Sequence, residues 1–144
     1  MNNIKIAQTF PLYIWKFVDE RNYQGWNLVS SQDGIDCILK ILNDMKNEKY
    51  SSICTFSTTK PTKELIGKIA NTLIKSKKIY PDKFHIIYKP NIKQSSIIFE
   101  CELKLVLGSL HEFEQCLKDT KSSIERGIEL ENDNLTIWSS NYAR

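Results

Sequence analysis

Residues 97–127 read IIFECELKLVLGSLHEFEQCLKDTKSSIERG, and they contain the clearest structural pattern in the chain. Along residues 97–107, apolar side chains alternate with charged ones, and this period of two predicts an antiparallel strand with one buried face. After a glycine, Ser109 stands three positions before Glu112, which is the spacing of a helix capping box. The helix that follows should end near Gly127. Its apolar stripe consists of Leu110, Phe113, Leu117, Thr120 and Ile124.

Two further helices are predicted where apolar residues repeat at intervals of three and four. The first spans residues 32–47, with Asp33 in its first turn and Lys46 near its end, as the helix dipole favours. The second spans residues 62–77. Further strands are predicted at residues 4–9, 12–18, 26–30, 53–58, 84–89 and 135–139.

These elements predict a single domain of the α+β class over residues 1–144. We expect a mainly antiparallel sheet with about three helices packed on one of its faces. Residues 90–95 form a loop of hairpin length, so the strands at 84–89 and 97–107 should be neighbours.

Composition places the chain among globular proteins, with 41% hydrophobic and 26% charged residues. No apolar run approaches the length of a membrane span, and the first residues lack the features of a signal peptide. We therefore expect a cytoplasmic protein with no membrane partner. The four cysteines contain no C-x-x-C pair, so we expect reduced, mostly buried thiols.

Charge is sorted along the chain in a way that favours a binding function. From Lys60 to Lys93 there are nine lysines and two acids, a local net charge of +7. From Gln94 to Arg144 there are nine acids and five bases, a net charge of −4. Such a polarised chain is suited to an oppositely charged partner.

Motifs for catalysis, cofactors or metals are lacking. The glycines form no phosphate-binding pattern, and no histidine pair has metal-ligand spacing. Glu112 and Glu114 stand two positions apart on a helix and should not converge, whereas Glu100 and Glu102 should share a solvated strand face. We therefore predict no catalytic residue, no cofactor and no metal.

A cysteine-dependent enzyme is the weakest alternative that the residues leave open. Its nucleophile would be Cys116 or Cys54, and a base would have to come from His85 or His111. A structural role for these residues is the simpler interpretation.

A nucleic-acid-binding protein is the stronger alternative, because clustered lysines attract phosphates. The candidate basic patch consists of Lys63, Lys68, Lys75, Lys77 and Lys78. This stretch contains no arginine, and a solvated lysine-rich face is the competing interpretation.

Aromatic residues are concentrated near the start of the chain: Phe10, Tyr13, Trp15, Phe17, Tyr23 and Trp26. Tyr13, Trp15 and Phe17 should share one face of a strand whose other face is also apolar. We expect core packing for both faces, with an interaction surface on one of them as the alternative.

Three stretches of the chain resemble small bacterial immunity proteins of contact-dependent or polymorphic toxin systems, which are encoded beside toxin genes. The first is GWNLVSSQDG at residues 25–34, which runs into CILKIL at residues 37–42. The others are SICTFSTTKPT at residues 52–62 and LVLGSLHEF at residues 105–113.

The resemblance implies a protein that binds and neutralises a cognate toxin domain and has no chemistry of its own. If the toxin is a basic nuclease, the acidic last third of the chain should contact it. The expected partner-binding residues are Glu125, Glu129, Glu131 and Asp133. An acidic toxin would instead face the lysine-rich segment.

Overall fold

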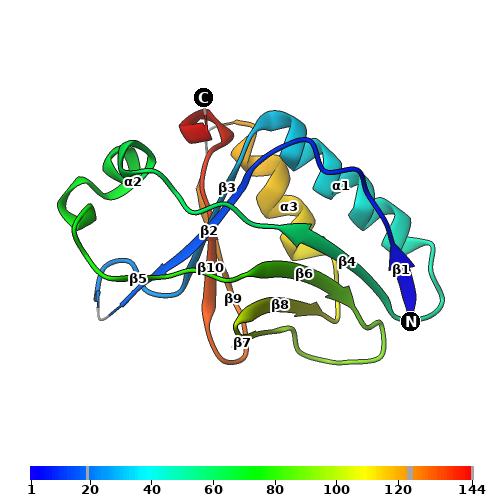
Figure 1. Ribbon diagram of the computed structural model, residues 1–144. Coiled ribbons are helices and arrows are strands. Elements are labelled where there is room, and N and C mark those ends of the chain that lie inside the picture. The colour runs from blue at the N-terminus through cyan, green and yellow to red at the C-terminus, as the bar shows by residue number, and fades with distance from the viewer. Residues whose placement is uncertain (19, 123–124, 144) are drawn as a thin grey trace.

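The structure, a computed structural model, describes residues 1–18, 20–122 and 125–143. Within these ranges, the chain forms three α-helices and two mixed five-stranded sheets (Figure 1). The predicted α+β class is confirmed, although the strands are divided between two sheets in place of the single expected sheet. No helix in the described ranges has the length and apolar character needed to cross a membrane.

The first sheet is built around a parallel pair of strands, β6 and β8. Its other parallel pair, β1 and β4, lies at one edge, and the remaining neighbours are antiparallel. In spatial order the strands are β1 (Asn2–Ile4), β4 (Ser52–Ser57), β6 (Lys83–Tyr88), β8 (Glu102–Leu107) and β7 (Ser96–Glu100).

The second sheet joins strands from both ends of the sequence, because β10 pairs in parallel with β3. Its remaining neighbours are antiparallel. In spatial order the strands are β5 (Lys78–Ile79), β2 (Leu12–Phe17), β3 (Trp26–Ser30), β10 (Asn134–Ile137) and β9 (Arg126–Glu129).

Two of the three helices share one core. Helices α1 (Gln32–Lys46) and α3 (His111–Thr120) pack with the inner faces of both sheets in the larger hydrophobic cluster. Helix α2 (Lys63–Ala70) instead covers the opposite face of β2 and β3. Helix α2 continues into the short 3₁₀ helix η1 (Asn71–Leu73). A second 3₁₀ helix, η2 (Ser140–Ala143), contacts α2.

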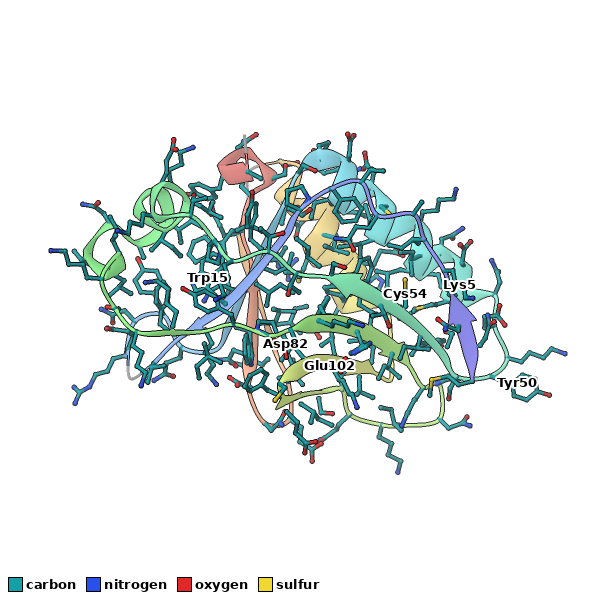
Figure 2. The ribbon with its side chains drawn as sticks, viewed as in Figure 1. Lys5, Trp15, Tyr50, Cys54, Asp82 and Glu102 are labelled. Atoms are coloured by element: carbon teal, nitrogen blue, oxygen red, sulfur yellow. The ribbon has the colours of Figure 1, made fainter. Side chains whose placement is uncertain are left out.

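The aromatic face of β2 is therefore part of a second core. Trp15 and Phe17 are buried with Leu65 and Ile66 of α2, while Leu12 and Ile14 belong to the larger core on the other side of the strand. Figure 2 labels Trp15 beside β2, in the part of the molecule where α2 lies. Core packing on both faces, as expected, accounts for the apolar character of this strand.

The predicted strand at residues 97–107 is in fact two strands. The chain reverses at Cys101, which has a positive φ of 65°, so that Glu100 of β7 lies opposite Glu102 of β8. The carbonyl oxygen of Cys101 accepts a hydrogen bond from the Asp82 N–H at 2.8 Å, which fixes the turn. Apolar and charged residues keep alternating on both sides of Cys101, so the sequence pattern predicts one continuous strand in place of two.

The predicted hairpin between residues 84–89 and 97–107 is wrong, although the second half of that stretch, β8, does lie beside β6 as its parallel neighbour. Strand β8 lies between β6 and β7, and the connection after β6 crosses the end of β8 to reach β7. Leu103 and Leu105 of β8 are completely buried, which explains why this strand takes a central position.

The first turn of α3 differs from the expected capping box. Leu110, not Ser109, occupies the N-cap position and makes no side-chain cap hydrogen bond. Leu110 is buried in the larger core, so burial of an apolar side chain determines where this helix begins.

The end of α3 also differs from expectation. The helix ends at Thr120, and Gly127 lies within β9, where Ile128 is opposite Leu135 of β10. Ile124, which the expected helical stripe includes, lies outside the described residues.

Two other predicted boundaries were wrong. The first strand is Asn2–Ile4, and residues 5–9 contain no strand. The Gln8 side chain takes the place of a strand there, since its Oε1 accepts from the Ser57 N–H at 2.8 Å and its Nε2 donates to the Ser57 carbonyl at 2.9 Å. Helix α2 ends at Ala70, where the backbone leaves helical geometry (φ −144°, ψ 75°) and Leu73 reaches the second core.

Candidate binding site

The four acidic residues expected to bind a partner are separated by the fold. Glu129 at the end of β9 and Glu131 in the β9–β10 connection are exposed and line the same pocket. Asp133 makes an ion pair with Lys16 at 2.6 Å and is mostly buried. Glu125 precedes β9 and hydrogen-bonds to Tyr142 of η2. Asp133 and Glu125 therefore have structural partners, whereas Glu129 and Glu131 face solvent.

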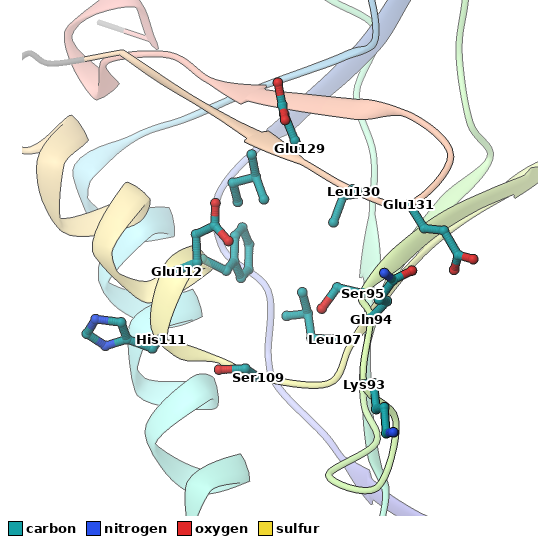
Figure 3. A pocket seen from close by; sticks show the side chains of 12 residues that line it. Lys93, Gln94, Ser95, Leu107, Ser109, His111, Glu112, Glu129, Leu130 and Glu131 are labelled. Atoms are coloured by element: carbon teal, nitrogen blue, oxygen red, sulfur yellow. The ribbon is translucent and has the colours of Figure 1, made fainter.

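A pocket of about 550 Å³ lies where α3, the β9–β10 connection and the β6–β7 connection meet (Figure 3). Glu112 in the first turn of α3 joins Glu129 and Glu131 at this pocket, and Lys93 lies on the far side. Three carboxylates and one ammonium group give the pocket a net charge of −2 when His111 is neutral. We call this pocket the acidic cleft.

The floor of the acidic cleft is apolar. Leu107, Phe113 and Ile128 are buried in the larger core and present one side to the cleft, and Leu130 is half-buried beside them. In Figure 3, His111 points away from the other side chains, and the carboxylate of Glu131 lies at the rim. The cleft therefore combines an apolar base with an acidic rim.

Backbone and side-chain hydrogen bonds hold the cleft walls together across the two sheets. The Glu131 N–H donates to the Ser95 carbonyl at 3.1 Å, and the Ser95 hydroxyl accepts from the Gly108 N–H at 3.0 Å. The Asn132 side chain accepts from the Ile97 N–H at 3.1 Å and donates to the Ile97 carbonyl at 2.7 Å. These contacts fix the β9–β10 connection against β7.

The carboxylates of the cleft differ from the other acids of α3 in their ion pairing. Within the described ranges, none of Glu112, Glu129 and Glu131 is in an ion pair. Two other acids of α3 are already occupied, since Glu114 binds Lys46 and Lys118, and Asp119 binds Arg126 at 2.6 Å.

These ion pairs lower the pKa values of the two acids. The hydrogen bond from Lys46 lowers the pKa of Glu114, and the hydrogen bond from Arg126 lowers the pKa of Asp119. These paired acids stabilise the fold, whereas the three acids of the cleft make no ion pair with any residue that the structure describes.

The cleft can bind a long cationic side chain. An arginine or lysine carries an aliphatic stem that packs on an apolar floor and a charged end that reaches carboxylates at a rim. A metal ion is a poorer match, because the described part of the chain has no group of three or more His, Cys, Asp or Glu side chains suited to one.

The candidate lysines do not act as one uniform group. Lys63, Lys75 and Lys77 are exposed, and Lys68 faces Glu64 at 3.8 Å. Lys78 turns inward and donates to the carbonyls of its own turn, at 2.9 Å to residue 74 and 2.6 Å to residue 76. Burial lowers the pKa of Lys78, so this lysine caps a turn and contributes little to a phosphate-binding surface.

The two candidate cysteine nucleophiles lie in the core. Cys54 and Cys116 are buried, and burial raises the pKa of both thiols, that of Cys54 to about 11. A thiolate nucleophile needs a lowered pKa and access to solvent, so both observations oppose this role. All four cysteines are free, with Cys101 exposed and Cys37 half-buried.

Sequence reasoning missed two arrangements, one at the acidic cleft and one on the first sheet. Glu112 was considered only for helix capping and metal binding, although its place in the first turn of a helix already put it on the surface. The second feature is the contact of His85 with Thr55 and Glu102, which depends on strand register that local patterns do not encode.

No family model matches the chain, and no curated protein or solved structure matches it either.

Proposed function

We propose that the protein is an immunity protein that binds a cognate toxin domain through the acidic cleft and inhibits it without catalysis. The observation that carries the proposal is the cleft itself, in which three carboxylates without an ion pair among the described residues surround an apolar floor. The sequence resemblance to immunity proteins supports the choice of a toxin as partner.

The proposed partner surface is basic, as on a nuclease that binds nucleic acid. A lysine or arginine of the toxin would enter the cleft, with its stem against Phe113 and its charge between Glu112 and Glu129. Covering a toxin's basic substrate groove in this way would block access to it, and no reaction would be needed from the immunity protein. Complementary charge would also speed association by about 10- to 1000-fold at low ionic strength.

The first test is affinity capture from the cytosol of the source cells, with mass spectrometry of the retained protein. The captured protein is then expressed alone and together with the chain. The proposal expects growth arrest in the first case and growth in the second. Recovery of nucleic acid that is released by salt would instead favour the lysine-rich segment, and arrest that persists on co-expression would refute immunity.

The second test locates the binding face. Glu129→Lys and Glu131→Lys should each slow association with the captured toxin by about tenfold or more at low salt. Glu64→Lys is the matched control, because this acid is exposed on α2 and its reversal changes the net charge equally. Equal association rates for the control and both cleft variants would exclude the acidic cleft as the contact.

A further inference from the structure

A second chemical arrangement lies on the first sheet, outside the acidic cleft. Thr55 of β4 and His85 of β6 are direct partners in the strand register, and Glu102 of β8 follows on the next strand. The Thr55 hydroxyl is 2.8 Å from His85 Nδ1, and Glu102 Oε1 is 2.7 Å from His85 Nε2. A hydroxyl, an imidazole and a carboxylate thus form a continuous hydrogen-bonded row.

The three side chains project from the face of the sheet that turns away from the core. The neighbouring positions Cys54, Phe56 and Phe84 belong to the larger core, and side chains alternate between the two faces of a strand. Thr55 is exposed, whereas only 12% of the His85 side chain is exposed. Thr55 is therefore open to solvent, whereas the neighbouring imidazole of His85 is mostly buried.

Hydrogen bonding determines where the protons lie in this row. Glu102 stays ionised, since the hydrogen bond from His85 lowers its pKa. An ionised carboxylate only accepts, so the proton of neutral His85 lies on Nε2 and the lone pair of Nδ1 faces the Thr55 hydroxyl. The hydroxyl then donates to Nδ1, which is the arrangement that activates an alcohol as a nucleophile.

We propose that Thr55 is a site of covalent acylation, with His85 as the general base and Glu102 as the residue that orients it. In this step, Thr55 Oγ1 attacks the carbonyl carbon of an activated ester while its proton passes to His85 Nδ1. The bond from the carbonyl carbon to the leaving group breaks, and the leaving group departs with the electron pair as an anion. The product is an acyl ester on Thr55.

Charge near the row favours the anionic transition state of this step. Lys83 and Lys104 are close enough to stabilise the Glu102 carboxylate, and Lys104 is the register partner of His85. Both lysines are exposed on the same side of the sheet as Glu102, and their positive charge favours the negative charge that develops during the attack. Thr55 does not line the acidic cleft, and we expect single acylation without efficient turnover.

The experiment uses the full chain and p-nitrophenyl acetate as the acyl donor. Peptide mapping measures acetyl ester at Thr55 and at the exposed Thr9, Thr59 and Thr72, which serve as controls within the same molecule. We expect Thr55 to react at least about 100-fold faster than these hydroxyls, the usual contribution of a positioned base.

Variants separate this chemistry from folding. Thr55→Val keeps the shape of the side chain and should abolish the ester at this position, while His85→Gln should slow acylation of Thr55 by about 100-fold or more. Glu102→Gln should slow it less, because that amide still accepts from Nε2 and loses only the charge. Urea unfolding midpoints identify any variant that fails to fold. If a variant fails to fold, the proposal is tested by the acetylation rate of Thr55 relative to the control threonines in the wild-type chain.

Equal acetylation of all four threonines, or an unchanged rate in folded His85→Gln, would overturn the proposal. The result does not depend on the toxin, since neither Thr55 nor His85 lines the acidic cleft.

Discussion

Replacing Asn132 with alanine tests the link between the two sheets. The Asn132 amide makes two hydrogen bonds to the backbone of Ile97, at 3.1 and 2.7 Å, and in this way takes the place of a neighbouring strand at the edge of β7. Alanine removes both. Each hydrogen bond contributes a net of about 1 kcal/mol, so the free energy of unfolding should fall by about 2 kcal/mol.

Urea unfolding followed by tryptophan fluorescence measures this loss. Trp26 is a suitable reporter, since it is buried and its ring centroid lies 5.0 Å from that of Phe99 on β7. The thermal midpoint should fall by about 4–8 °C, because each kcal/mol corresponds to about 2–4 °C at this chain length.

The matched control is Asn91→Ala, an exposed asparagine in the connection between β6 and β7. Its substitution should change the free energy of unfolding by less than about 0.5 kcal/mol. If Asn132→Ala is indistinguishable from this control, the amide does not hold the sheets together and the rigid cleft wall inferred from it is wrong.

Three further predictions concern the core and its ionised groups. Gly108→Ala should destabilise the fold by about 1–3 kcal/mol in urea unfolding, because its Cβ would lie 2.4 Å from a backbone carbonyl oxygen of the facing loop. Iodoacetamide at neutral pH should modify the exposed Cys101 and spare Cys54 until the chain unfolds, since burial raises the pKa of Cys54 to about 11; early labelling of Cys54 would contradict its burial. Lys46 lowers the pKa of Glu114 in the folded state, so this pair stabilises the protein above the ordinary pKa of 4.5 and the contribution is lost as the pH falls through the lowered value. Lys46→Met should reduce that acid dependence in unfolding titrations, and an unchanged slope would show that the pair contributes nothing.

Local patterns predicted the elements whose shape depends on nearby residues. Helix α1 was predicted to within one residue, and its Ser31 cap accepts from the Gly34 N–H as such a residue should. Strand β3 was predicted at its observed bounds. In both elements, the pattern of apolar residues and the residues that mark the ends lie within the same short stretch of sequence, so local reasoning was sufficient.

Features that depend on distant partners were not predictable in this way. The reversal at Cys101 and the central place of β8 follow from pairing with β6, and β9 forms because β10 offers it an edge. Of the four acids expected to bind a partner, Glu129 and Glu131 line the acidic cleft, and their role in binding stays a prediction. The presence of Glu112 at the cleft depends on how α3 approaches β9, which local patterns do not encode.

The pairing of β10 with β3 has a consequence for how the chain folds. Trp138 Nε1 donates to Asn27 Oδ1 at 2.9 Å across 111 positions of sequence, and Leu135 lies beside Trp26 in the same pairing. Contacts between such distant residues form slowly, because a long loop must close before they contribute. Strand β3 thus keeps an unpaired edge until β10 arrives, and during synthesis the second sheet is completed only after nearly the whole of this sequence has been made.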